Sequence, residues 1–149
     1  MVADVPRVAQ AVILNLREQL IRDEENRQFV YTDSVGVPTI GVGRNLLAKG
    51  LSELEREFML HNDIAEHTLE VWQSLPVVAT LDEIRREALI NMSFNLGTGG
   101  LLKFVKFLAA LQAKQYTTAA KEMLDSKWAE QVGPRAVRLS QQILTGVRQ

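Results

Sequence analysis

Three side chains near the start of the chain have types that suit proton transfer: Glu24, Asp33 and Thr39. Glu24 follows Leu20 by four positions, so it continues the side of a helix that apolar residues occupy. A carboxyl group there is partly withdrawn from water, which favours its protonated form and suits it to donate a proton near neutral pH. The alternative is a solvated acidic run at the helix end, because both sequence neighbours of Glu24 are acidic as well.

Asp33 and Thr39 lie where a hairpin is expected, and each has an ordinary structural explanation. Aspartate at a turn commonly bonds its own backbone, and threonine is a common β-branched strand residue. Strand alternation predicts one face made by Val37, Thr39, Gly41 and Gly43. The glycines leave this face nearly bare, either to relieve crowding against a helix or to let a flat group such as a sugar ring lie on the strand.

The elements that must position these residues follow from the periodicity. Apolar residues recur every fourth position from Val8 to Leu20, which predicts an amphipathic helix, and Asp4 could cap its start. Two short strands are expected on either side of a turn at 33–36. Ser52 and Glu55 have the spacing of a capping box that opens a long helix. Further helices are predicted over residues 82–96, 101–113, 117–124 and 135–144.

The composition is that of an ordinary globular protein and excludes several classes. Of 149 residues, 46% are hydrophobic, and 17 basic against 18 acidic side chains give a formal charge of -1. A nucleic-acid-binding protein usually carries a large basic excess, which is missing here. No cysteine is present, so the fold needs neither disulfides nor an oxidising compartment. The N-terminal residues fit neither a signal peptide nor a membrane span, so we expect synthesis in the cytoplasm.

Three motifs in register resemble one family. Residues 22–43 carry Glu24, eight residues, Asp33, five residues and Thr39, followed by Ile-Gly-Val-Gly. This arrangement resembles the catalytic stretch of the phage T4-type lysozymes, the family 24 glycoside hydrolases. Residues 81–97 are similar to the central core helix of that family, and 126–136 to its C-terminal segment.

The resemblance implies an α+β, predominantly helical, lysozyme-like fold. We expect a single domain, 1–149, with a small N-terminal β-hairpin lobe at about 22–50. A long helix would join it to a larger helical C-terminal lobe, at about 75–149, that also includes the N-terminal helix.

The resemblance also assigns roles. Glu24 would be the general acid, Asp33 the general base and Thr39 a residue that positions the attacking water. Arg135 matches an arginine that in the family reaches towards the catalytic acid. Glycoside cleavage needs one protonated and one ionised carboxyl group, and room for water between them, about 6.5–9.5 Å, gives inversion. We therefore predict inversion.

Three further residues fall in the matched core helix and its end, near the cleft by analogy, namely Asn91, Phe94 and Asn95. Helix capping and backbone bonding at the glycine turn is the alternative for the two asparagines, and core packing is the alternative for Phe94.

The sequence departs from the family in several places. Arg44 stands where better-known members have histidine, and we expect it to pair with Asp63, unless both are solvated charges. Phe107 and Glu122 occupy positions where Ser and Asn would be expected. The segment between Gly43 and the helix at residue 52 is short, which predicts a trimmed small lobe.

The histidines and tryptophans have plainer expected roles. We expect His61 and His67 to be surface residues rather than metal ligands. We expect Trp72 and Trp128 to pack rather than to form sugar platforms.

The predicted function is a muramidase that cleaves the β-1,4 bond between N-acetylmuramic acid and N-acetylglucosamine in peptidoglycan, as an endolysin for host cell lysis. The alternative is a catalytically weak or inactive lysozyme-fold module that binds glycan or protein. We expect peptidoglycan strands as partner, no nucleic acid, no stable membrane insertion, no cofactor and no metal. A separate membrane-permeabilising protein would release it to the periplasmic wall. The lack of an obvious exposed apolar stripe predicts a monomer.

Overall fold

The computed structural model describes the backbone of residues 7–24 and 26–149, and their side chains except those at 7–11 and 15. The chain divides into two compact units, one ending at Met59 and the other running from Leu60 to Gln149. The predicted cap at Asp4 lies outside the described residues.

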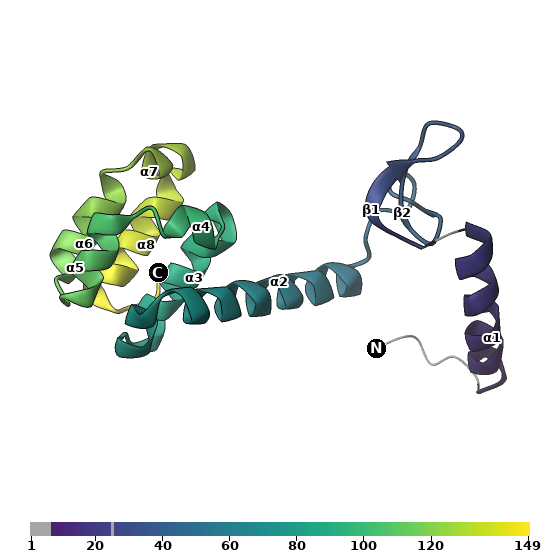
Figure 1. The fold of residues 1–149 in the computed structure, drawn as a ribbon, viewed down its shortest axis with the longest axis horizontal. Helices are drawn as coiled ribbons and strands as arrows, with labels where there is room; N and C mark the ends of the chain where they lie inside the picture. The colour runs from purple at the N-terminus through teal and green to yellow at the C-terminus, as the bar shows by residue number, and fades with distance from the viewer. Residues whose placement is uncertain (1–6, 25) are drawn as a thin grey trace. The chain divides into compact units, whose positions relative to one another are not determined.

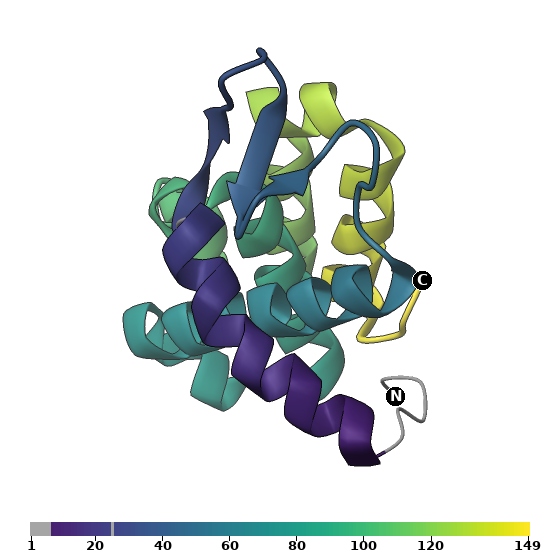
Figure 2. The ribbon, with the colours of Figure 1, turned by 90° about the vertical axis from the view of Figure 1, so that its right-hand side faces the viewer.

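Unit 1 contains one helix and a small sheet (Figure 1). Helix α1 (Arg7–Glu24) is followed by β1 (Arg27–Thr32), β2 (Pro38–Gly41) and β3 (Arg44–Asn45). The strands are antiparallel in the order β1-β2-β3, so β2 is the central strand, and Figure 2 shows β1 and β2 beside each other. The sequence predicted α1 and the first two strands but missed β3, which is too short to carry a two-residue alternation.

Helix α2 (Glu53–Ser74) begins in unit 1 and ends in unit 2. The predicted capping box is confirmed at its start. The Ser52 amide donates to Oε2 of Glu55 at 2.8 Å, and the Glu55 amide donates to the Ser52 hydroxyl at 3.3 Å. Two donors that the first turn of a helix leaves without partners are thereby satisfied.

Unit 2 is helical throughout its described elements (Figure 1). They are η1 (Pro76–Thr80), α3 (Glu83–Leu96), α4 (Thr98–Leu101), α5 (Val105–Gln112), α6 (Tyr116–Leu124), α7 (Lys127–Val132) and α8 (Pro134–Thr145). Asp82, where this helix was predicted to start, caps α3 by accepting from the Arg85 amide. The short helices α4 and α7 were not foreseen. The predominantly helical α+β class is confirmed.

The hydrophobic core lies in unit 2. Its largest fully buried side chains include Leu89 of α3, Phe107 of α5, Met123 of α6 and Ile143 of α8. These helices pack because each presents one apolar side at the 3.6-residue period. The sequence placed these helices correctly for that reason.

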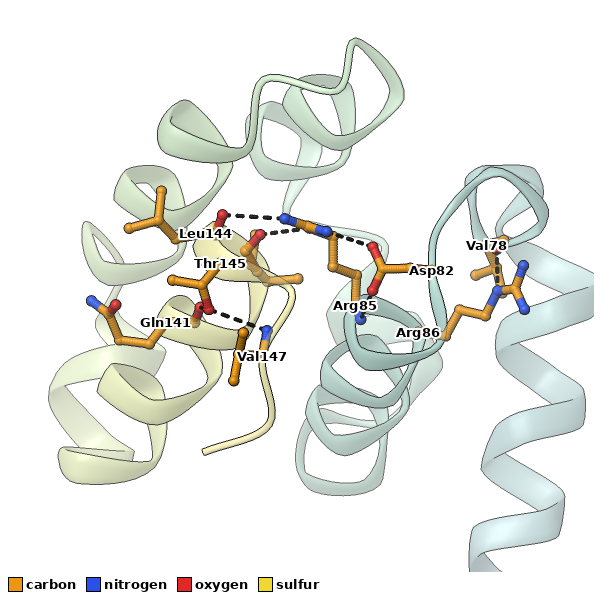
Figure 3. Close-up of polar contacts among 9 residues, drawn as sticks. Val78, Asp82, Arg85, Arg86, Gln141, Leu144, Thr145 and Val147 are labelled. Carbon is orange, nitrogen blue, oxygen red and sulfur yellow. Dashed lines mark hydrogen bonds and ion pairs between the residues drawn. The ribbon is translucent and has the colours of Figure 1, made fainter.

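An arginine on α3 holds the end of α8 in place (Figure 3). The Arg85 Nε donates to the Ile143 carbonyl at 2.7 Å, and Nη2 donates to the Leu144 carbonyl at 3.1 Å. A positive charge suits these carbonyls because the C-terminal end of a helix carries partial negative charge. The same guanidinium lies 3.7 Å from the ring centroid of Tyr116 and pairs with Asp82. Burial alone would raise the pKa of Asp82, but the hydrogen bonds from Arg85 outweigh it and lower that pKa.

Candidate functional site

Glu24 lies at the last position of α1, and its carboxylate reaches the backbone of the turn between β2 and β3. A Cβ atom at Gly43 would lie 2.8 Å from Oε2 of Glu24 and 3.2 Å from its Cδ. The carboxyl group therefore rests directly against the bare Cα of Gly43. The two residues are far enough apart in sequence that this approach was not predicted.

Glu24 is exposed in unit 1, so the desolvation expected from its place on the helix is not seen there. The apolar side of α1 is also open, and Leu16 and Leu20 are both 43% exposed. They line a hollow of about 410 Å³ together with Ile13, Ile21 and Val42. The monomer expected from the sequence stays a prediction.

Asp33 builds the turn between β1 and β2. Its Oδ1 accepts from the amides of Val35 at 2.9 Å and Val37 at 2.8 Å, and its own amide donates to the Val37 carbonyl at 3.0 Å. Gly36 completes the turn with a φ of +86°, which L side chains rarely adopt. Oδ2 of Asp33 receives no hydrogen bond from the described residues. The turn-making role considered from the sequence is thus confirmed, and it engages one of the two carboxylate oxygens.

Thr39 lies at the centre of β2, where it pairs with Tyr31 of β1 and Asn45 of β3. It is 3% exposed, and its hydroxyl donates to the Val37 carbonyl at 3.0 Å. Because a hydroxyl oxygen has two acceptor lone pairs, Thr39 can still accept a hydrogen bond from water. Asp33 and Thr39 are therefore joined through Val37, whose amide bonds the first and whose carbonyl bonds the second.

The predicted strand face of alternating residues is wrong at its end. Strand β2 ends at Gly41, and Gly43 lies in the turn that leads to β3. Both glycines have positive φ, +63° at Gly41 and +65° at Gly43, so the chain bends where the alternation assumed an extended strand. Of the two explanations for the glycines, relief of crowding against a helix applies to Gly43, because a Cβ atom there would meet Glu24 of α1. Gly41 has no atom within 4 Å of its Cβ position, so it faces open space.

Arg44 pairs with Glu55, and the predicted pair with Asp63 is wrong. Its Nη2 donates to Glu55 Oε2 at 2.8 Å, Nη1 bonds the other carboxylate oxygen, and Nε donates to the Gly50 carbonyl at 2.8 Å. All three nitrogens of the guanidinium thus bond groups that lie within eleven residues of Arg44 along the chain. The Ser52 amide, followed by Arg44, holds the pKa of Glu55 down to about 2.

Arg135 and Asn91 bond each other in unit 2. The Arg135 Nε donates to Asn91 Oδ1 and Nη2 donates to the Asn91 carbonyl, both at 2.9 Å. They line a groove of about 410 Å³ with Phe94, which is 38% exposed, and with apolar residues that include Ile64 and Ile90. Phe94 is therefore a groove residue rather than a core residue.

Asn95 bonds the ring of Trp128. The indole Nε1 donates to Asn95 Oδ1 at 2.8 Å, and Trp128 is 4% exposed. The packing role predicted for Trp128 is confirmed, whereas the capping role considered for both asparagines is wrong, because their amide oxygens accept from Arg135 and Trp128 instead. Trp72 is 44% exposed, with the Arg86 guanidinium 5.1 Å from its ring centroid.

The histidines differ from each other. His61 is exposed as expected, but His67 is partly buried and its Nδ1 lies 3.2 Å from the Ser93 hydroxyl. Among the described residues no group of three or more histidine, cysteine or acidic side chains could hold a metal ion. Phe107 is a core residue, and Glu122 lines a hollow with Lys103 and Lys106. In the described part of the chain no helix is both long and apolar enough to cross a bilayer.

Comparison with known proteins places this geometry in one family. The family model described as phage lysozyme matches residues 22–142, a range that holds every candidate site residue. The chain is 29% identical to "Probable T4-type lysozyme 1" of Dictyostelium discoideum, over 91% of this chain and 96% of that protein. A second such protein of the same organism is 27% identical over the same shares.

The chain also matches part of a larger protein. It is 29% identical to the pre-baseplate central spike protein Gp5 of Enterobacteria phage T4, over 89% of this chain and 28% of the spike protein. The chain thus spans little more than a quarter of that relative.

Proposed function

Because the chain belongs to the phage lysozyme family, whose members are glycoside hydrolases, we propose that it is a muramidase with Glu24 as its acid. The bond cleaved is the β-1,4 linkage from N-acetylmuramic acid to N-acetylglucosamine in peptidoglycan. The observation that carries the proposal is that unit 1 brings the Glu24 carboxylate onto Gly43, in the turn that directly follows β2, the strand that holds Thr39.

The proposed reaction uses the two carboxyl groups in opposite protonation states. Glu24 donates its proton to the glycosidic oxygen as the bond from the anomeric carbon to that oxygen breaks. The oxygen of a water molecule attacks the anomeric carbon from the other face, and Asp33 accepts the proton that this water loses. Exchange with solvent then returns both groups to their starting states. Attack from the opposite face inverts the anomeric configuration.

The hydrogen bonds of Asp33 support its proposed role. Two amide donors fix Oδ1, which orients the carboxylate without any other side chain, and Oδ2 is the oxygen that would take the proton. The Thr39 hydroxyl, oriented by its bond to the Val37 carbonyl, would accept a hydrogen bond from the water. Asn91, Phe94, Asn95 and Arg135 are proposed to support or bind the glycan from unit 2.

An isosteric substitution tests the acid. Glu24→Gln is expected to abolish the clearing of purified sacculi or chloroform-permeabilised Gram-negative cells. Glu18→Gln is the matched control, because Glu18 is an exposed carboxylate on the same helix. Clearing that survives in the Glu24 variant would refute the assignment. A well-folded native protein that clears neither substrate would instead indicate the second function considered, a glycan- or protein-binding module without turnover.

Muropeptide analysis tests bond and stereochemistry together. Digestion is expected to release fragments that end in reducing N-acetylmuramic acid, initially in the α configuration. Fragments in the β configuration would refute inversion, and reducing N-acetylglucosamine would refute the bond.

The biological setting is part of the same proposal. The protein would be a monomeric endolysin, made in a bacterial cytoplasm and released to the wall by a separate membrane-permeabilising protein. The N-terminal helix would belong to the helical lobe. Sedimentation analysis tests the monomer, and co-expression with and without a permeabilising protein tests the route of release.

A further inference from the structure

A chain of four polar side chains links α2 to the junction of α3 and α4 inside unit 2. The Thr98 hydroxyl donates to Oε2 of Glu70 at 2.5 Å, the hydroxyls of Thr98 and Ser93 lie 2.9 Å apart, and Ser93 Oγ lies 3.2 Å from Nδ1 of His67. Ser93 is fully buried, so its hydroxyl must find its partners within the protein. The proposed mechanism uses none of these residues.

The number of protons fixes the direction of every bond in this chain. Ionised Glu70 can only accept, so the single proton of the Thr98 hydroxyl is directed to it. Thr98 must then accept from Ser93, and Ser93, whose own proton is now committed, must accept from Nδ1 of His67. The three hydrogen bonds need three protons, and the two hydroxyl groups supply two of them. The third proton must therefore be on Nδ1 of His67.

We propose that His67, Ser93, Thr98 and Glu70 form a proton-ordered latch between α2 and the α3–α4 junction. The latch is complete while Glu70 is ionised and weakened when Glu70 takes up a proton. A protonated carboxyl group is a neutral acceptor at one oxygen and a donor at the other, and a donor at Oε2 would oppose the Thr98 hydroxyl. Hydrogen bonds to an ionised acceptor are roughly twice as strong as those between neutral groups.

The position of the latch gives it a mechanical consequence. Gly97, which lies between Ser93 and Thr98, has a φ of +72°, and two more glycines follow at positions 99 and 100. Backbone without side chains is poorly restrained by packing. The latch therefore holds a glycine-rich junction against α2. The ring of His67 also contacts Phe94, with 5.2 Å between the ring centroids.

Glu70 is the acidic side chain that lies nearest to the ring of His67 among the contacts described for it. Its Oε2 lies 3.9 Å from Nδ1 of His67. Asp63 is the acidic residue one turn earlier on α2. Of the described residues with contacts to His67, those from α3 are Ser93 and Phe94, and α4 reaches it through Thr98, none of which carries a charge.

Unfolding as a function of pH tests the latch. Thr98→Val should lower the urea midpoint at neutral pH, and the gap to the native protein should shrink by about half as Glu70 becomes protonated, because the Thr98 hydroxyl donates to this charged acceptor. Carbon NMR of the Glu70 carboxyl group gives the pH at which this happens. Thr68→Val is the matched control, because Thr68 is also partly buried but its hydroxyl donates to the Ile64 carbonyl of its own helix. A Thr98→Val gap as constant with pH as the Thr68→Val gap would overturn the proposal.

Nitrogen NMR of His67 tests the direction without relying on a core variant. In the native protein, neutral His67 should carry its proton on Nδ1. In Thr98→Val, the Ser93 hydroxyl is free to donate to Nδ1, so the Nε2-protonated form should become the major one. A native protein with Nδ1 unprotonated at neutral pH would overturn the proposed order.

Discussion

Replacing Gly43 with alanine adds a single methyl group where Glu24 meets the turn between β2 and β3. The new Cβ would lie 2.8 Å from Glu24 Oε2, whereas ordinary contacts begin at 3.4 Å, so the carboxylate must retreat by about 0.6 Å. The backbone φ of +65° is an added strain, because a left-handed conformation costs an L residue about 1–2 kcal/mol.

The two effects predict different measurements. The strain should lower the free energy of unfolding by about 1–2 kcal/mol, seen in urea titration. The displaced carboxylate should lower kcat, because misplacement of a catalytic group by about 1 Å can cost about 100-fold in rate. For a shift of about 0.6 Å we expect a loss of about 10- to 100-fold on soluble glycan, with KM less affected.

Gly41→Ala is the matched control. Gly41 has nearly the same φ, +63°, but nothing within 4 Å of its Cβ position. The Gly41→Ala variant should lose as much stability as Gly43→Ala does, and its kcat should stay that of the native protein. If a sugar lies on this bare segment, Gly41→Ala should raise KM instead. Equal kcat values for the two variants would refute the argument that Glu24 acts from its place over Gly43.

Three other substitutions each test one local feature of the structure. Arg85→Ala should lower the free energy of unfolding by about 2–4 kcal/mol, measured in urea, because two carbonyls of α8 lose a charged donor. A loss below about 1 kcal/mol would contradict the conclusion that Arg85 holds the end of α8 in place. The pKa of Glu55 is lowered to about 2 from 4.5, so its contribution to stability is present above pH 4.5 and lost as pH falls towards 2. Glu55→Gln should flatten that part of the pH–stability curve, and an unchanged slope would count against the ion pair. Lys114→Gly should raise the unfolding free energy by about 0.5 kcal/mol by relieving a φ of +56°, whereas Lys121→Gly, inside α6, should lower it by about 1 kcal/mol.

The fold was predictable where the signal was local and repeated. Amphipathic spacing identified α1 and the longer helices of unit 2, and side-chain chemistry identified the capping box at Ser52. Strand β3 and helix α4 were missed because elements of two and four residues are too short for a periodic pattern to repeat within them. Strand β3 pairs with β2, and the Thr98 side chain of α4 bonds Glu70 of α2.

The contacts of the site were less predictable than its residues. Arg44 was expected to pair with Asp63 by family analogy, but the nearer Glu55 already faces it, because the capping box orients that carboxylate at the start of α2. The approach of Glu24 to Gly43 likewise depends on a backbone bend that no alternation rule contains.

Asp33 indicates why structural and chemical explanations of one residue need not compete. Read alone, its bonds to the amides of Val35 and Val37 account for an aspartate at a turn without any catalysis. Those bonds use Oδ1, and they also prevent the carboxylate from rotating, which a base that must meet a water molecule requires. Asp33→Asn separates the two roles, because the amide oxygen can still accept from both backbone donors while the group can no longer take a proton. We expect this variant to keep the native unfolding midpoint within about 0.5 kcal/mol and to lose activity. A variant that loses stability and activity together would assign Asp33 to the turn alone.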